Sequence, residues 1–258
     1  MTDVKKLYIL LCGYEIIRKS GCTRGSGHNI ILAVPICAYL LETSHGLVMF
    51  DTGLDSCRLA DHCASRALFA NDTFPAPPIV LPEHELLPQL AAIGVAADDI
   101  GQVVVSHTHS DHVGHLRHFR RARATIQRLE YDAAFSDEGR SSPFFSEIES
   151  PDINWHIIDG DQQIMPGLNA ILTRGHRPGH QSLVVNLPKS GTKILTGDCA
   201  DLRENFDKEI LGSSIDDEAA LASIRRLNTI AAKTKGELVP LHDPDFVQKA
   251  RLAPLFYA

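Results

Sequence analysis

Four residues that can bind metal follow one another closely after a hydrophobic stretch. Residues 103–112 read VVVSHTHSDH and contain His107, His109, Asp111 and His112. His107 and His109 alternate along an extended chain, so both side chains can point the same way. Asp111 and His112 stand at the turn into an expected helix and can reach a neighbouring point in space. Because imidazole and carboxylate ligands favour zinc or a similar first-row ion, this segment predicts a site for two metal ions.

Other polar residues downstream can complete such a site. His176 and His180 each follow a glycine in an exposed turn. Spacing alone does not choose between His176 and His180. The non-functional alternative for His107–His112 is a cluster of solvated polar residues at the end of a strand. That explanation suits one histidine, but four potential ligands after a buried strand favour the metal site.

These segments resemble the metallo-β-lactamase superfamily and, within it, the N-acyl homoserine lactonase branch. The resemblance rests on the order and spacing of FDTG at 50–53, the motif at 106–112, TRGHRPGHQS at 173–182, LTGD at 195–198 and LHD at 241–243. It covers nearly the whole chain and includes ENF at 204–206 and FYA at 256–258. It implies an α/β fold, a four-layer αββα sandwich, formed by one domain over residues 1–258.

Carried over residue by residue, the resemblance also implies a ligand set. One metal is held by His107, His109 and His176, the other by Asp111, His112 and His242, and Asp198 bridges them. Two Zn²⁺ per chain are expected, with other divalent transition metals as substitutes. His180 then either supports a ligand or packs as a polar group, and we favour packing. Asp51 either orients a ligand or occupies a turn before Thr-Gly, and we favour the first role.

The implied chemistry is hydrolysis of an ester bond in a small molecule. Two metal ions about 3.5–4 Å apart can hold a hydroxide and polarise a carbonyl oxygen. Zinc lowers the pKa of its bound water to about 7. The resemblance implies a lactonase that opens N-acyl homoserine lactones or related lactones by attack of the metal-bridging hydroxide. Asp111 is placed to carry a proton to the leaving alkoxide.

One position departs from the branch. Its members carry a tyrosine three residues after the bridging aspartate, where this chain has Asp201. An ionised aspartate cannot donate a hydrogen bond to a substrate. Either another group donates or the substrate differs, and a role in capping a turn is an equal alternative. We treat Asp111 and Asp201 as the candidate catalytic residues.

Other functions fit the sequence less well. A thioesterase or another ester hydrolase of the superfamily is the main alternative, and a non-catalytic, metal-stabilised binding protein is the second. A β-lactamase would carry cysteine at position 198, and Cys199 would face the other side of a strand. A nuclease would use the arginines at positions 117, 120, 121 and 123, for which a solvated helix end is the favoured explanation.

Composition agrees with these expectations. A net charge of -7 argues against nucleic-acid binding, which depends on Lys and Arg. The apolar run at 7–12 is too short for a signal peptide and suits a buried strand. Without a membrane span or a cysteine framework, we expect a cytoplasmic monomer or homodimer whose cysteines are mostly buried thiols.

The elements that must position these residues follow from apolar patterns. Strands are expected at 7–12, 30–41, 47–50, 103–106, 124–127, 155–158, 168–173, 182–187 and 193–196, and helices at 82–93, 111–119, 130–135 and 216–233. Two long irregular segments, 54–81 and 138–152, are expected to be functional or disordered. Phe144 and Phe145 in the second segment either line an apolar groove or anchor the loop.

Overall fold

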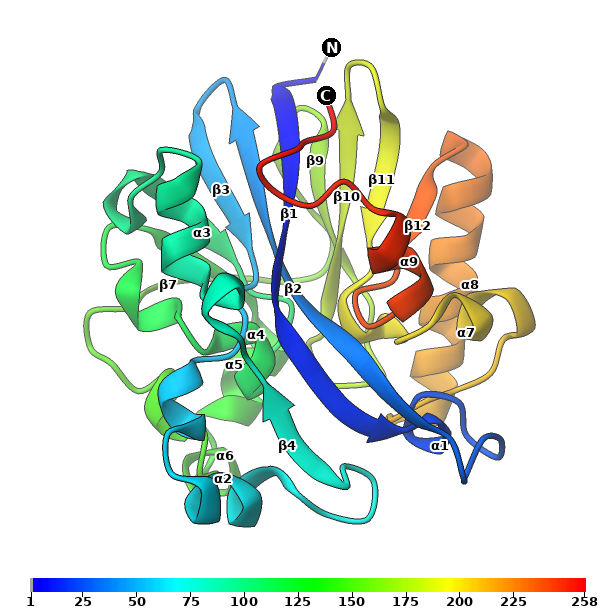
Figure 1. Cartoon of the computed structure of the whole chain (residues 1–258). Coiled ribbons are helices and arrows are strands. Elements are labelled where there is room, and N and C mark those ends of the chain that lie inside the picture. Colours follow the sequence, from blue (N-terminus) through cyan, green and yellow to red (C-terminus); the bar gives the residue numbers. More distant parts are fainter. Residues whose placement is uncertain (1) are drawn as a thin grey trace.

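Two β-sheets packed face to face form the centre of the computed structural model, which describes residues 2–258 (Figure 1). The larger sheet has the strand order β4-β1-β2-β3-β5-β6-β7 and the smaller one β12-β11-β10-β9-β8. The strands of the larger sheet are β1 (Val4–Arg18), β2 (Ile31–Thr43), β3 (Gly46–Phe50), β4 (Ala76–Ile79), β5 (Ile100–Val104), β6 (Arg123–Gln127) and β7 (Asn154–Ile158). Those of the smaller sheet are β8 (Gln162–Met165), β9 (Leu168–Leu172), β10 (Gln181–Leu187), β11 (Gly191–Leu195) and β12 (Glu237–Val239).

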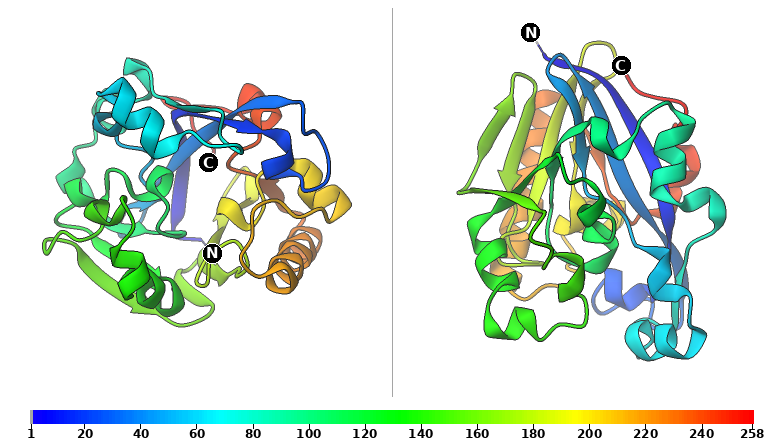
Figure 2. Two further views of the ribbon diagram at one scale, coloured as in Figure 1. Left: turned by 90° about the horizontal axis from the view of Figure 1, so that it is seen from below. Right: turned by 90° about the vertical axis from the view of Figure 1, so that its left-hand side faces the viewer.

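Helices cover the outer faces of both sheets (Figures 1 and 2). The helices of the described chain are α1 (Lys19–Cys22), α2 (His62–Phe69), α3 (Leu86–Ala92), α4 (Ser110–Val113), α5 (Arg128–Ala134), α6 (Asp137–Arg140), α7 (Arg203–Lys208), α8 (Asp217–Thr234) and α9 (Pro244–Lys249). Of these, α1, α2 and α6 lie at one end of the molecule (Figure 1). Within residues 2–258, no helix is long and apolar enough to cross a membrane.

Three apolar clusters hold these layers together. Between the sheets, Leu7 and Phe50 of the larger sheet pack in one cluster with Leu183 of the smaller. Further clusters join the larger sheet to α3 and the smaller sheet to α8, through residues such as Leu86 and Ile224. A helix layer, two sheets and a second helix layer make the αββα sandwich, which confirms the predicted fold class.

The longest helix shows how local sequence sets these layers. In α8, Ala220, Ile224 and Leu227 are buried at helical spacing. The Asp216 side chain caps its start by accepting a hydrogen bond from the backbone N–H of Ala219 at 3.0 Å. The prediction of a helix at 216–233 is therefore confirmed.

The helix predicted at 111–119 is wrong. The helical segment α4 ends at Val113, and a separate 3-10 turn follows at Leu116–His118. The carbonyl of His112 accepts hydrogen bonds from Thr52, at 2.7 Å from its N–H and 3.0 Å from its hydroxyl. That contact joins α4 to the loop after β3. Because the His112 carbonyl is used in this way, it does not accept the hydrogen bond that would continue the helix.

Short elements of the irregular segments were missed. Segment 54–81 contains α2 and β4, and segment 138–152 contains the end of α6 and a 3-10 turn at Phe145–Glu147. The predicted strand at 7–12 extends over Val4–Arg18, because its second half pairs with β2 as far as Arg18 opposite Ile31. Both irregular segments lie at the side of the molecule where the predicted ligands gather.

Candidate metal centre and its cavity

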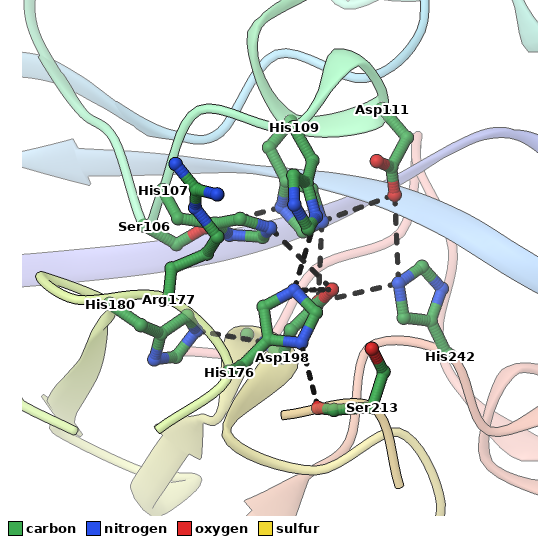
Figure 3. Close-up of polar contacts among 12 residues, drawn as sticks. Ser106, His107, His109, Asp111, His176, Arg177, His180, Asp198, Ser213 and His242 are labelled. Atoms are coloured by element: carbon green, nitrogen blue, oxygen red, sulfur yellow. Dashed lines mark hydrogen bonds and ion pairs between the residues drawn. The ribbon is translucent and has the colours of Figure 1, made fainter. Parts of the chain in front are cut away.

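Seven histidine and aspartate side chains converge in two groups at the ends of strands from both sheets (Figure 3). The first group is His107, His109, His176 and Asp198, and the second is Asp111, His112 and His242. Within each group the ligand atoms lie within 4.8 Å of one another. They come from the end of β5, from α4, from the β9–β10 loop, and from the turns after β11 and β12. The structure therefore brings together every predicted ligand.

Asp198 lies between the two groups, with one carboxylate oxygen toward each. Its Oδ2 is 3.6 Å from Nε2 of His107 and 3.3 Å from Nε2 of His176. Its Oδ1 is 3.2 Å from Nε2 of His112 and 3.3 Å from Nε2 of His242. This is the arrangement that a bridging carboxylate requires.

Unpartnered atoms in this space fit a divalent metal. Nε2 of His107, Nε2 of His112 and Oδ1 of Asp198 are buried, and their geometry forms no hydrogen bond with any group of residues 2–258. Leaving a buried polar atom unsatisfied costs about 1–3 kcal/mol, so such atoms require an explanation. Imidazole nitrogens together with carboxylates suit a divalent first-row ion. A metal facing these atoms would satisfy them.

Burial keeps His107 and His109 of the first group neutral. It lowers the pKa of His107 well below its ordinary value and the pKa of His109 to about 3. Nδ1 of His109 lies 3.1 Å from Nε2 of His176, so the two nitrogens face the same point. Neutral imidazole is the form that binds metal. These rings are therefore ready to bind an ion without losing a proton.

The second group attracts positive charge. His242 is buried, which lowers its pKa, but Asp198 and Asp111 outweigh burial and raise the pKa to about 10. His112 is raised well above its ordinary pKa in the same way, against burial, by Asp111 and Asp198. A divalent cation among these carboxylates would supply the positive charge in place of the ring protons.

Backbone carbonyls orient two of the ligand rings. Nδ1 of His242 lies 2.8 Å from the carbonyl of Pro35, and Nδ1 of His176 lies 3.1 Å from that of Ser213. A carbonyl only accepts, so each Nδ1–H donates and each Nε2 keeps its lone pair for a metal. Figure 3 shows the second of these contacts.

Asp51 contacts a predicted ligand, as the favoured alternative expected. Its Oδ2 lies 2.8 Å from Nδ1 of His112, and its Oδ1 accepts the backbone N–H of Ser106 at 2.7 Å. Asp51 is fully buried and adopts φ of 58°, the left-handed region that few non-glycine residues occupy. Backbone strain of this kind persists where surrounding contacts fix it, and here those contacts hold His112 in place.

His180 does more than pack, contrary to the favoured expectation. Burial lowers its pKa to about 3, so the ring is neutral, and its Nε2 accepts the backbone N–H of Asp198 at 2.9 Å. A side chain at Gly197 would collide with that ring, because an added Cβ would lie 2.6 Å from Nε2. His180 therefore positions the backbone of the residue between the two groups.

Glu130 is a supporting residue that the sequence did not reveal. Its buried carboxylate accepts hydrogen bonds from the N–H and hydroxyl of Thr108 at 3.0 and 2.8 Å, from Nε of Arg177 at 3.2 Å and from the N–H of Gly179 at 3.2 Å. It thus joins the segment of His107 and His109 to the β9–β10 loop. The available signal was its spacing of four residues from Ala134, which put an acidic group on the buried face of the predicted helix.

A cavity of about 780 Å³ opens beside the two groups. Its inner end is lined by Asp111, His176, Asp198 and His242, and its outer end by apolar residues such as Phe69 and Phe144. The rings of Phe69 and Phe144 lie 5.4 Å apart. Phe144 and Phe145 both line the cavity, and Phe145 also packs against the core. The second irregular segment therefore contributes to an apolar groove and is anchored to the core by Phe145.

The two candidate catalytic residues both line this cavity. Asp111 Oδ2 lies 3.1 Å from Nε2 of His112 and 3.6 Å from Nε2 of His242. Burial works to raise its pKa, but these rings outweigh burial and lower it. Asp201 is half-buried in the same cavity wall, beside Cys22 and Gly212.

The predicted basic run is engaged by neighbouring polar groups. Arg117 pairs with Asp55, Arg120 with Asp152 at 3.8 Å and Arg121 with Asp98 at 3.4 Å, and Arg123 donates to Gln102 at 3.3 Å. Their charges are therefore used locally. All six cysteines are free thiols, four of them buried.

Comparisons with known proteins agree with this geometry. The profile of the Metallo-beta-lactamase superfamily matches residues 33–198. The chain is 32% identical to the N-acyl homoserine lactonase of Bacillus thuringiensis over 251 residues, which is 97% of this chain and 98% of that protein. It is 27% identical over 269 residues to the N-acyl homoserine lactonase AttM of Azorhizobium caulinodans, covering 100% of both. A solved N-acyl homoserine lactone hydrolase, with N-hexanoyl-L-homoserine bound at its catalytic metal center, matches with a TM-score of 0.90 and 32% identity over 100% of both chains.

Proposed function

Since this chain belongs to the metallo-β-lactamase superfamily and, within it, to the N-acyl homoserine lactonase family, we propose that it is a metal-dependent hydrolase that opens lactone rings. N-acyl homoserine lactones are the leading substrates, because the relatives that match over their full length are named for them. The cavity of about 780 Å³ has the size of a small-molecule site.

The observation that carries the proposal is the position of Asp198 between two ligand groups. Each of its oxygens faces histidines of a different group at 3.2–3.6 Å. We therefore propose two Zn²⁺ per chain, the first held by His107, His109 and His176, the second by Asp111, His112 and His242, with Asp198 shared. Zinc at these positions would supply a nucleophile near neutral pH and polarise the carbonyl oxygen of the ester.

The chain's own residues provide the remaining steps. The apolar outer end of the cavity, with Phe69 and Phe144, accepts an acyl chain and keeps water from it. Asp111 reaches both the cavity and the second group, and its lowered pKa keeps it an ionised carboxylate that is quick to give up a proton. We propose that Asp111 receives the proton of the attacking water and passes it to the leaving alkoxide.

A pH-stat assay tests this function, because ring opening of a neutral lactone releases a proton near neutral pH. The purified metal-loaded chain should hydrolyse N-acyl homoserine lactones faster than matched thioesters and phosphodiesters. Chelation should abolish the rate, and added Zn²⁺ should restore it. If a thioester turns over far faster than every lactone, the alternative of a thioesterase replaces the lactonase. A protein that binds metal but cleaves none of these substrates would be a binding protein.

The whole ligand set comes from one chain, so the proposed centre needs no partner subunit. We accordingly propose a monomer or homodimer, which light scattering can distinguish. Free thiols persist in reducing compartments, so the six free cysteines support the cytoplasm as the proposed location.

A further inference from the structure

Three carboxyl side chains of the cavity wall lie outside the ligand groups, and one of them, Glu138, is exposed. Glu15 on β1 and Asp201 before α7 are both half-buried, and both line the cavity that contains Asp111, Asp198 and His242. On β1, Glu15 and Ile17 face the cavity, whereas Tyr14 between Gly13 and Glu15 turns away and its ring contacts His84.

Few structural contacts occupy these two carboxyl groups, although the Cys22 thiol contacts the carboxyl group of Asp201. Within residues 2–258, no lysine or arginine forms an ion pair with Glu15 or Asp201, and the charged groups that act on them are chiefly those of the ligand groups. Asp201 also caps no turn. The N–H of Leu202 donates to Asn205 at 2.8 Å, and the N–H of Arg203 donates to Asp243 at 2.7 Å. The turn-capping alternative for Asp201 therefore has no contact to support it.

The charge of the site supports a role for both groups. Two divalent ions would bring four positive charges, against which stand the carboxylates of Asp111, Asp198 and Asp51. Glu15 and Asp201 can add two further negative charges, so a cationic substrate would meet no net repulsion at the cavity wall. Without metal, burial raises the pKa of Glu15 to about 8 and that of Asp201 to about 6, and the positive charge of bound metal would favour the ionised form of both.

We propose that Glu15 and Asp201 select substrates that carry an ammonium group close to the ester that is cleaved, such as amino lactones. This inference rests on the proposed lactonase function and adds a substrate class beside the N-acyl homoserine lactones. A carboxylate only accepts hydrogen bonds, and an ammonium offers three donors with a positive charge. An acylated amino lactone offers one amide N–H and no charge, so it uses this pair of acids less fully.

A matched series of lactones tests the inference on the metal-loaded enzyme. L-Homoserine lactone, α-hydroxy-γ-butyrolactone and γ-butyrolactone differ only in carrying an ammonium, a hydroxyl or a hydrogen next to the ester carbonyl. The wild type should show a kcat/KM for the ammonium compound at least tenfold above that for γ-butyrolactone. Glu15→Gln and Asp201→Asn should each reduce this ratio about tenfold, the range for losing a charge-assisted hydrogen bond.

Two controls remove the same charges elsewhere. Glu83→Gln and Asp132→Asn change exposed residues outside the cavity and should keep the wild-type ratio. Metal content and circular dichroism identify a variant that fails to fold, in which case the wild-type ratio decides. An unchanged ratio in both cavity variants overturns the proposal. Equal wild-type kcat/KM values for the hydroxyl compound and the ammonium compound overturn it too.

Calorimetry separates this inference from the proposed function. L-Homoserine and 4-hydroxybutyrate are the ring-opened products with and without the ammonium group. If the wild type hydrolyses no lactone, the lactonase proposal fails, but at least tenfold tighter binding of L-homoserine would still support ammonium recognition. Equal binding of the two products would overturn it.

Discussion

The cavity has two halves that are built in different ways. Its inner wall consists of the two ligand groups, and its outer wall of the cavity-lining residues in segments 54–81 and 138–152. In the inner wall each buried acid faces imidazoles, as Asp51 and Asp198 both face His112. Aromatic contacts such as that of Phe69 with Phe144 dominate in the outer wall. Glu147, a buried acid in the same segment that does not itself line the cavity, pairs with Nε of Arg58 at 3.3 Å. Charge is thus balanced closely where metal chemistry is expected and loosely where the substrate tail would lie.

Removing the shared carboxylate should have the largest effect. Asp198→Asn takes a negative charge from both ligand groups, and we expect kcat/KM to fall by more than about 100-fold, the upper range for losing an outer-shell partner of a metal. Mass spectrometric metal analysis should show fewer than two ions per chain. Asp132→Asn removes an exposed carboxylate and serves as the matched control. Two bound ions at a wild-type rate would show that Asp198 does not bridge.

Single histidine variants can separate the two ligand groups. His107→Ala removes a neutral ring from the first group, and His242→Ala removes a ring from the second. Each should leave about one ion per chain and little activity, because a three-ligand site tolerates little loss. The expected result is a halved metal content in both variants, measured after gel filtration. A variant that retains both ions would place that histidine outside the metal shell.

Asp51→Asn should weaken only one group. The amide can no longer balance charge on His112, so affinity for the second metal should fall about 10–100-fold, as for other outer-shell partners. Competition with a chromogenic chelator measures both affinities. Equal weakening of both metals would contradict the assignment of Asp51 to the second group.

The contrast between the walls also explains what the sequence revealed. The inner wall was predictable because four of its ligands follow one strand within six residues, and the family resemblance implied His176, Asp198 and His242. The three strands that were missed, β4, β8 and β12, are all sheet edges. In β4, Pro77 and Pro78 argue against a strand, yet an edge tolerates proline because one side needs no partner.

Contacts between distant segments account for the rest. Glu130 and His180 support the ligands through hydrogen bonds to distant residues. Glu130 accepts the backbone N–H of Gly179, and His180 accepts that of Asp198. Glu15 lies beyond Gly13, where the first apolar run of β1 ends. Asp111, which lines the same cavity, is 96 residues further along the chain, so no local pattern related the two residues. Local patterns predicted the ligands that stand close together in the sequence. The positions of Glu130, His180 and Glu15 depend on contacts between segments that are distant in the sequence.

The smallest expected effect concerns Glu147, the buried acid in the second irregular segment. Burial raises the pKa of Glu147 from an ordinary 4.5 to about 7, and the Arg58 guanidinium opposes this only in part. The folded state therefore binds a proton that the unfolded chain releases. The resulting stability is fully present below about pH 4.5 and is lost as the pH rises through about 7, and it amounts to about 3 kcal/mol in the free energy of unfolding.

Glu147→Gln should remove this dependence, because an amide does not titrate. Urea unfolding of wild type and variant, both metal-loaded, should show the variant gaining relative stability between pH 5 and pH 8. Metal binding also changes with pH, but both proteins share that change, so it cancels in their difference. Glu149→Gln alters an exposed residue of the same loop and should follow the wild type at every pH. If the difference between Glu147→Gln and wild type stays constant with pH, Glu147 is ionised throughout, and its buried charge is balanced by Arg58 as fully as the acids of the inner wall are by their histidines.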